Sequence, residues 1–306
     1  MHLTPEYLHT PLSTLLSLRD DFLDNLTACT LCPHSCKVNR TNGKVGFCQA
    51  PDHLVIGSSA VHQGEEPPIS GVNGSGTVFY SYCTLVCLYC QNYPLSQLHH
   101  GNILTEEDLS EMFLTLQKKG CHNINWVSPT QFLPFILSSL LLAREKGLHV
   151  PIVYNCSGWE NEWVLTRLKY FIDIYLPDSR YSNNETAFTY SKANHYVEIN
   201  QKALLLMREN QPDDLWEDDL IKKGLIVRVL ILPNHAEETI TVLRNLRGIL
   251  GKDTYISLMS QYFPCHKALE HPLLNRVISK SEYESVQNEM NRLGFEKGWV
   301  QDYDPT

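Results

Sequence analysis

The chain has 306 residues, of which 43% are hydrophobic and 19% are charged, and this balance excludes wholesale disorder, a coiled coil and a collagen-like fibre. The formal net charge of −9 disfavours general binding to nucleic acid or to an anionic membrane. We therefore expect a globular protein with a buried core and with no nucleic-acid or membrane partner.

The first 62 residues predict a helix followed by a cysteine-rich segment. Apolar residues at helical spacing run from Leu12 to Leu26 after the Thr10-Pro11 start signal. A short strand is predicted at residues 53–62. We divide the chain into an N-terminal helix and cysteine-rich metal-binding module, residues 1–62, and a second domain, residues 63–306.

From residue 77 onward, short strands alternate with single helices. Strands are predicted at 77–82, 124–127, 151–154, 172–176, 225–232 and 255–262, and the first and last helices at 105–120 and 281–293. This alternation is typical of right-handed βα units around a parallel sheet. The fold class is therefore α/β, a partial (β/α)6 TIM-like barrel with its chemistry at the carboxyl ends of the strands. The acidic stretch 213–219 is expected to be a solvated connector.

Three cysteines form a C-x3-C-x2-C motif directly after the first predicted barrel strand, at Cys83, Cys87 and Cys90. Thiolates are the usual ligands of iron–sulfur clusters, and three of them can hold three corners of a [4Fe–4S] cube while the fourth iron stays open. The alternative is a set of buried or zinc-binding cysteines. A structural zinc site requires four ligands, and the fourth would have to come from far along the chain.

This triad, on the first βα loop of a six-unit barrel, resembles the signature of the radical S-adenosylmethionine (SAM) enzymes. Nearly the whole chain resembles the pyruvate formate-lyase activating enzyme-like Fe–S proteins. The resemblance rests on stretches in a fixed order: residues 29–36, 46–48, 65–71, 90–92, 123–125, 151–155, 174–178 and 257–262.

The resemblance implies an enzyme with a [4Fe–4S] cluster whose open iron binds SAM. One electron from the reduced cluster then cleaves the C5′–S bond, and the 5′-deoxyadenosyl radical takes hydrogen from a protein, as in glycyl-radical activation, or from a small molecule. An electron donor of the flavodoxin or ferredoxin type is also implied. The alternative from another class is a non-catalytic iron–sulfur or zinc-binding structural protein.

The resemblance further implies residues that bind the cofactor. It places Tyr89 near the adenine and Thr130, in the segment Ser128-Pro129-Thr130, near the SAM amino group. The remaining residues are Asn155 and Asp178, at strand ends that hold a cation beside the SAM carboxylate in formate-lyase activators, and Arg228, which pairs with the carboxylate or ribose region. Ordinary packing is the alternative for Tyr89, and a salt bridge inside the barrel is the alternative for Arg228.

Two acidic residues, Glu65 and Glu66, lie in a predicted loop before the barrel. They could act as acid or base groups, but carboxylates in an exposed loop are usually just solvated. We therefore expect them to face water.

A second group of four cysteines, at Cys29, Cys32, Cys36 and Cys48, lies within twenty residues. Four thiolates with turn residues between them favour a closed tetrahedral metal site. Zinc and an auxiliary iron–sulfur cluster both suit the spacing, and four free cysteines with a packing role are the alternative. The position of the group, before the barrel, differs from the ferredoxin-like insert of many glycyl-radical activators, which follows the triad.

Clustered cysteines in a chain of this length point to metal binding in a reducing compartment rather than to a disulfide scaffold. The first Lys or Arg is Arg19, so the basic start of a secretory signal is missing. We expect a cytoplasmic location.

Overall fold

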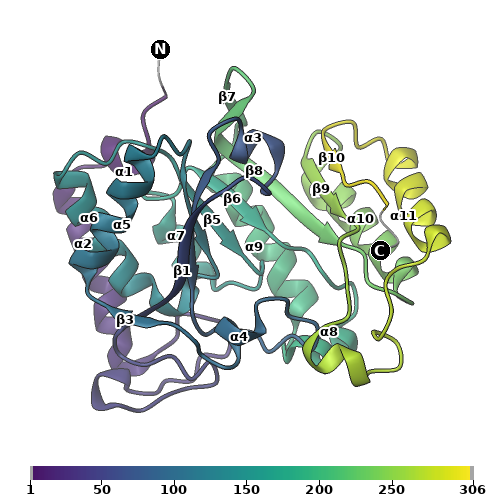
Figure 1. Ribbon diagram of the computed structural model, residues 1–306, viewed down its shortest axis with the longest axis horizontal. Coiled ribbons are helices and arrows are strands. Elements are labelled where there is room, and N and C mark those ends of the chain that lie inside the picture. Colours follow the sequence, from purple (N-terminus) through teal and green to yellow (C-terminus); the bar gives the residue numbers. More distant parts are fainter. Residues whose placement is uncertain (1–2, 304–306) are drawn as a thin grey trace.

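A computed structural model describes residues 3–303 of the protein, and a row of parallel strands forms its centre (Figure 1). The six strands of this row run in the spatial order β2, β4, β5, β6, β8, β9. Their bounds are β2 (Ser75–Tyr80), β4 (Ile124–Val127), β5 (Ile152–Cys156), β6 (Ile174–Pro177), β8 (Leu220–Leu230) and β9 (Tyr255–Met259). Because all six are parallel, their carboxyl ends lie at the same end of the molecule.

Four further strands complete the ten-stranded sheet. They are β1 (Leu54–His62), β3 (Asn102–Leu104), β7 (Leu215–Glu217) and β10 (Gly298–Val300). β1 pairs antiparallel with both β2 and β3, and β10 extends the parallel row beyond β9. The sheet order ends at β3 on one side and at β10 on the other, so the barrel is open, and the predicted partial (β/α)6 fold is confirmed.

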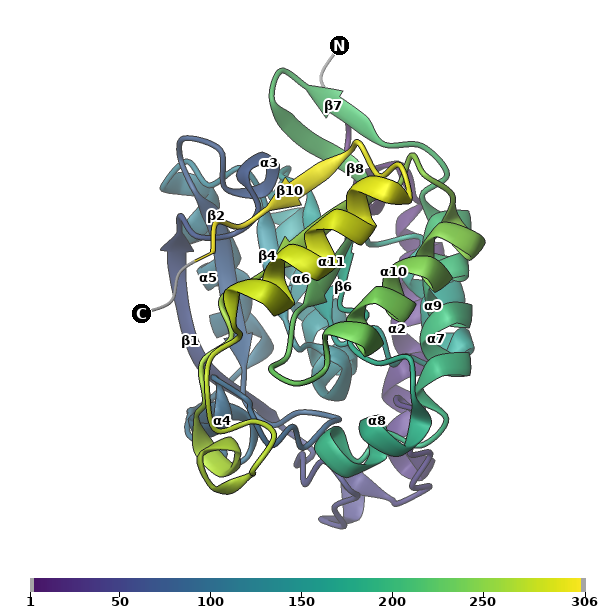
Figure 2. The same cartoon turned by 90° about the vertical axis from the view of Figure 1, so that its right-hand side faces the viewer.

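Helices cover much of the outside of the sheet (Figure 2). The longer ones are α2 (Leu12–Asp24), α5 (Glu106–Lys118), α6 (Leu133–Glu145), α7 (Glu162–Leu168), α9 (Tyr196–Asn210), α10 (Ala236–Leu250) and α11 (Lys280–Arg292). Successive pairs such as α5 with α6 and α10 with α11 pack together. The helix predicted from residue 105 is confirmed, and Thr105 forms a capping box with Asp108, in which each side chain bonds the other residue's backbone. No helix among residues 3–303 is long and apolar enough to span a bilayer.

Four short helices lie at the two ends of the barrel: α1 (Glu6–His9), α3 (Pro67–Ser70), α4 (Tyr93–Ser96) and α8 (Asn184–Ser191). Both views place α4 and α8 at one end and α3 at the other. Ile69 of α3 is fully buried against apolar residues of β5, β6 and β8, which fills the barrel at the α3 end. The α4 end, where the parallel strands terminate, is left for the site.

The acidic stretch 213–219 has no buried residue, as the prediction of a solvated segment requires, but the prediction of a plain connector is wrong. Residues 215–217 form β7, which turns back at Asp218 and pairs antiparallel with β8. Asp214 is also engaged, because its carboxylate accepts hydrogen bonds from the Arg208 guanidinium and the Leu225 backbone N–H. The prediction relied on the acidic composition of the stretch and did not use the apolar pair Leu215-Trp216, which is typical of a strand.

The domain boundary predicted at residue 62 stays a prediction. β1 lies on the N-terminal side of this boundary and pairs with β2 on the other side over most of its length.

Gly158 permits a close approach between the segments that follow β5 and β6. Its φ is +69°, and a Cβ there would lie 2.2 Å from the Asp178 carbonyl oxygen. We expect Gly158→Ala to lower the free energy of unfolding by at least about 1–3 kcal/mol, since backbone strain and overlap act together. Gly147 is the matched control, because its φ is +97° with nothing within 4 Å. Urea unfolding of both variants checks this, and an equal loss in Gly147→Ala would contradict the overlap argument.

Candidate active site

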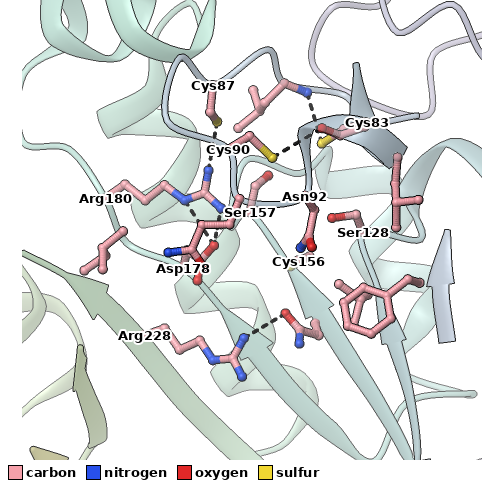
Figure 3. A pocket seen from close by; sticks show the side chains of 18 of the residues that line it. Cys83, Cys87, Cys90, Asn92, Ser128, Cys156, Ser157, Asp178, Arg180 and Arg228 are labelled. Carbon is pink, nitrogen blue, oxygen red and sulfur yellow. Dashed lines mark hydrogen bonds and ion pairs between the residues drawn. The ribbon is translucent and has the colours of Figure 1, made fainter. Parts of the chain in front are cut away.

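A cavity of about 430 Å³ opens at the carboxyl ends of the parallel strands (Figure 3). Small-molecule sites usually occupy about 300–1,000 Å³, so the cavity can hold a ligand of cofactor size. Every one of the six parallel strands contributes to the wall, either directly or through the residue that follows it, with Phe79, Val127, Asn155, Asp178, Arg228 and Met259. The triad Cys83, Cys87 and Cys90 lines the same cavity.

The triad loop begins directly after β2 and is held on several sides. Tyr82 adopts a positive φ of 62°, which ends the strand and turns the chain into the loop. The backbone N–H groups of Val86 and Leu88 donate to carbonyl oxygens of Ser191 and Tyr190 at the end of α8. The loop conformation is therefore fixed by contacts with residues about 100 positions away.

Each triad sulfur has a hydrogen-bonding partner. The Cys83 sulfur accepts the Leu85 N–H at 3.4 Å, and the Cys90 sulfur lies 3.2 Å from the Ser96 hydroxyl. The Cys87 sulfur accepts from Arg180 Nη1 at 3.1 Å and from the Ser191 hydroxyl at 3.0 Å. Hydrogen bonds of this kind stabilise thiolates and tune the reduction potential of an iron–sulfur cluster.

Without a metal, two of these thiols hold their protons strongly. Burial, together with the nearby charge of Cys87, raises the pKa of Cys83 to about 12 and that of Cys90 to about 11. Metal binding by thiols releases their protons. As the side chains stand, no three Cys, His, Asp or Glu residues within 3–303 are grouped so as to hold a single metal ion.

The donor set of the triad suits a [4Fe–4S] cluster. Three thiols come from one loop, each with a hydrogen-bonding partner at its sulfur, and the loop faces the cavity. Cys83, Cys87 and Cys90 would hold three irons, and the cavity side would leave the fourth accessible to a ligand.

Arg180 connects the triad to the strand ends. Its guanidinium bonds both the Cys87 sulfur and the Asp178 carboxylate, and both contacts are visible in Figure 3. Asp178, predicted from the resemblance, therefore lines the cavity as the partner of Arg180. The contact of Arg180 with a triad cysteine was not predicted.

Tyr89 also lines the cavity, and it is buried. The Tyr89 hydroxyl lies 2.5 Å from the Tyr181 hydroxyl. The Tyr181 hydroxyl in turn lies 2.6 Å from the Ser191 hydroxyl. This chain of hydroxyls leads to the Cys87 sulfur.

Arg228 forms a buried ion-pair cluster with Glu65 and Glu66. Its Nη1 also donates to the Asn155 amide oxygen at 3.1 Å, so Asn155 is on the cavity wall as a partner of Arg228. The expectation that Glu65 and Glu66 are solvated is wrong, since their side chains are only 7% and 5% exposed. The alternative given for Arg228, a salt bridge inside the barrel, is confirmed.

The charges in this cluster stabilise one another. Burial opposes the ionised form of Glu66, but the adjacent Arg228 more than offsets it, and the pKa of Glu66 is held below its usual value. Burial likewise opposes the charge of Arg228, whose pKa is nevertheless raised by Glu66 and Glu65. Glu66 and Arg228 therefore remain charged at neutral pH.

Thr130 lies outside the cavity wall. It starts a short 3-10 helix, Thr130–Phe132, and its hydroxyl bonds the Glu160 carboxyl group at 3.0 Å and the Tyr154 hydroxyl at 3.0 Å. Ser128, two residues earlier, lines the cavity instead. Ser128 has a positive φ of 54°, a strained conformation that is frequent at ligand sites.

Glu160 is fully buried with no cationic partner in its hydrogen-bond set, and burial raises its pKa to about 8. The folded protein therefore keeps a proton that the unfolded chain releases near pH 4.3, so the free energy of unfolding falls as the pH rises from about 4.5 to 8. We expect Glu160→Gln to be more stable than the wild type by about 2–4 kcal/mol at pH 8.5 and nearly equal to it at pH 4.5. The exposed Glu162 provides the matched control, Glu162→Gln. Urea unfolding at the two pH values would contradict this if both variants behaved alike.

The four N-terminal cysteines lie together in one loop region. Cys32 is buried, and Cys29, Cys36 and Cys48 are half-buried. Burial, followed by the charges of other cysteines in the group, raises the pKa of Cys32. All ten cysteines of the chain are free.

Comparison with known proteins gives relatives without a stated activity. No family model matches the chain. Over 281 residues it is 27% identical to the uncharacterized protein MJ0674 of Methanocaldococcus jannaschii, covering 89% of this chain and 77% of the relative. It is 25% identical to MJ0808 of the same organism over 272 residues, covering 81% and 74%.

Two solved structures share the fold. Methylornithine synthase (PylB) matches with a TM-score of 0.51 and 17% identity over 74% of this chain. Native anSMEcpe, solved with bound AdoMet and the Cp18Cys peptide, matches with a TM-score of 0.50 and 13% identity over 69% of this chain. The chain spans 63% and 56% of these two proteins. At such identities, the likeness establishes the architecture of the barrel.

Proposed function

We propose that the protein is a radical SAM enzyme, in which Cys83, Cys87 and Cys90 hold a [4Fe–4S] cluster beside a SAM-binding cavity. The observation that carries the proposal is the meeting of three hydrogen-bonded thiols with a 430 Å³ cavity at the carboxyl ends of the strands. The fold likeness to a protein solved with bound AdoMet supports it. When bound and reduced, the cluster would supply the electron that cleaves SAM to methionine and a 5′-deoxyadenosyl radical.

The chain's own residues would bind and orient the nucleotide. Ser128 lines the cavity and Thr130 does not, so we assign the contact with the SAM amino group to the segment around Ser128. Asn155 lies on the same wall, and its amide nitrogen is not used by Arg228, since only its oxygen accepts that bond. Tyr89 offers a ring for the adenine from within the triad. Buried aromatic and apolar side chains would exclude water from the reacting centre.

Because the sequence stretches described above resemble the pyruvate formate-lyase activating enzyme-like Fe–S proteins, we propose hydrogen abstraction from a partner protein, as in glycyl-radical activation, or from a small molecule. A flavodoxin- or ferredoxin-type protein is the proposed electron donor. The location proposed for this chemistry is the cytoplasm.

Anaerobic reconstitution tests the function directly. The protein is loaded with iron and sulfide, reduced with dithionite and mixed with SAM, and methionine and 5′-deoxyadenosine are measured by mass spectrometry. We expect both products in equal amounts. A protein that takes up iron but produces neither would be the non-catalytic alternative. When a candidate partner protein is added to this reaction, a glycyl-radical EPR doublet would distinguish protein activation from small-molecule chemistry.

Arg180 is expected to set the properties of the cluster through the Cys87 sulfur. Arg180→Gln removes the charged donor at 3.1 Å, and loss of such partners costs about 10–100-fold in metal affinity or activity. The reduction potential should become more negative, because the added electron loses a nearby positive charge. Redox titration followed by EPR measures this. Arg208, paired with Asp214 away from the cavity, is the control position, and an unchanged potential in Arg180→Gln would contradict the assignment.

A further inference from the structure

The cavity of the candidate active site has a second polar region, at the end away from the triad. Figure 3 shows the triad cysteines at the upper end of the view and Arg228 at the lower end, with Asp178 between them. Arg228 forms ion pairs with Glu65 and Glu66, and we name these three residues the floor cluster. Arg228 and Glu65 both line the cavity, so part of the floor cluster is accessible to a ligand.

Within the floor cluster, Glu66 is fully engaged by protein groups. Its two carboxylate oxygens accept hydrogen bonds from Arg228, from Nε at 2.7 Å and from Nη2 at 2.8 Å, which is the bidentate geometry that suits a guanidinium group. The Ser257 side chain also bonds the Glu66 carboxylate. The charges of Glu66 and Arg228 therefore offset each other without any further group.

Glu65 is a second carboxylate beside the same cation. Its Oε2 contacts the Nη2 atom of Arg228, while no group in the described part of the chain donates a hydrogen bond to its Oε1. Two carboxylates and one guanidinium give the floor cluster a formal charge of −1. Because a charge away from bulk water is stabilised by a partner of opposite sign, this region favours a ligand that brings a positive charge.

The other charged groups of the cavity wall do not supply that charge. The Arg180 guanidinium bonds the Asp178 carboxylate and the Cys87 sulfur. Arg180 and Arg228 are the only Lys or Arg residues that line the cavity within residues 3–303, and each already has an acidic partner. The unbalanced negative charge of the wall is therefore located at Glu65.

The Glu65 carboxylate is held in place before any ligand arrives. Its backbone N–H donates to the Ser70 hydroxyl at 3.0 Å, and Ser70 is only 3% exposed. Ile69, next to Ser70, is fully buried in the barrel, which anchors this segment to the sheet. A carboxylate that is already fixed costs little ordering when a cation binds to it.

A second polar group is free beside the floor cluster. Asn155 is 7% exposed and lines the same cavity. Its Oδ1 accepts a hydrogen bond from Arg228 Nη1 at 3.1 Å, which orients the amide, and its Nδ2 donates to no other residue between positions 3 and 303. A ligand here would meet an acceptor at Glu65 and a donor at Asn155.

We propose that the floor cluster is the substrate subsite of the cavity, and that it selects a substrate with a guanidinium or ammonium group that pairs with the Glu65 carboxylate. This inference rests on the proposed function, in which SAM binds the iron at the triad end, so the SAM ammonium group lies away from Glu65. The charged group anchors the substrate at the floor cluster. The carbon atom that loses hydrogen then lies between the floor cluster and the triad.

Matched probes test the selectivity. The full-length protein, both metal-free and reconstituted, is titrated with n-butylguanidinium, with its neutral isostere n-butylurea and with anionic pentanoate, and binding is followed by saturation-transfer NMR. We expect n-butylguanidinium to bind about 10–100-fold more tightly than n-butylurea, and pentanoate to bind more weakly than either. Equal binding of the three probes, or no saturable binding of n-butylguanidinium, would overturn the proposal.

Glu65→Gln tests the residue. The preference for n-butylguanidinium should disappear in this variant and should persist in Glu162→Gln, at an exposed position. A preference that survives in Glu65→Gln would overturn the assignment to Glu65. Glu66 keeps Arg228 paired in this variant, so we expect it to fold, and the three probes on the wild type decide the question if it does not.

A peptide arm identifies the source of the charged group. Glycyl-arginyl-glycine with blocked ends is compared with its neutral citrulline counterpart. A preference for the arginine peptide as large as that for n-butylguanidinium supports a side chain of a partner protein as the substrate. A preference that is confined to the free probe supports a small molecule.

A last arm adds SAM to the reconstituted protein that has bound n-butylguanidinium. Simultaneous binding of both supports the proposal, whereas displacement of n-butylguanidinium by SAM would assign Glu65 to the nucleotide and overturn it. Failure of the proposed function is a different result. A protein that does not cleave SAM would still show the cation preference in its metal-free form.

Discussion

Replacing Cys87 by alanine is expected to reduce SAM cleavage to background. Cys87 is the triad cysteine with the most hydrogen-bond donors, since Arg180 and Ser191 both bond its sulfur. Without this thiolate, Arg180 keeps only Asp178 as an anionic partner, and the iron centre loses one of three protein ligands. We expect lower iron uptake at the triad and no methionine or 5′-deoxyadenosine.

Cys156→Ala is the control for this experiment. Cys156 also lines the cavity and is buried, but it belongs to neither group of cysteines. We expect it to retain the iron content of the wild type. Retained turnover in Cys87→Ala would contradict the triad assignment.

Replacing Arg228 by methionine is expected to cause the largest loss of stability. The change leaves Glu65 and Glu66 buried without a cation, and breaking a buried pair in this way usually costs about 3–5 kcal/mol. Urea unfolding of the metal-free, reduced protein at pH 7 measures the loss. Adding Glu65→Gln and Glu66→Gln to the variant should recover much of it, because the uncompensated charges are removed.

The loss should depend on pH in a defined direction. In the wild type, Arg228 lowers the pKa of Glu66. The stabilisation that the ionised Glu66 gives to the fold is therefore fully present above the usual carboxyl pKa, and it is lost as the pH falls below that value toward the lowered pKa. In Arg228→Met the unpaired carboxyls are protonated on acidification, which removes their penalty. The difference between the two proteins should therefore shrink from pH 7 to pH 4. Arg167→Met is the control, because Arg167 forms a largely exposed pair with Asp21. It should lower the free energy of unfolding by only about 0–1 kcal/mol. A loss as large as that of Arg228→Met would contradict this account.

Local features of the sequence were sufficient to predict the barrel and the triad. The alternation of strands and helices follows from patterns among residues that are close together in the sequence. The three triad cysteines likewise lie within eight positions of one another. The same holds for the capping box at Thr105, whose partner Asp108 is three residues away.

Contacts between distant residues were not predictable in the same way. Arg228 meets Glu66 across 162 positions, and His34 meets Thr84 across 50, so no local pattern connects them. Ser128 and Thr130 show a different limit. Ser128 has a positive φ and is followed by a 3-10 turn. This backbone path brings Ser128, and not Thr130, to the cavity wall, and the sequence pattern does not contain that information.

The central claim is that the triad leaves one iron open and that SAM binds there. Electron–nuclear double resonance of the reduced protein with SAM labelled by ¹⁵N at the amino group and ¹⁷O at the carboxylate tests it most directly. The account predicts hyperfine coupling of both labels to the cluster, which is lost in Cys87→Ala. A cluster spectrum that shows no coupling to either label and does not change when SAM is added would contradict it.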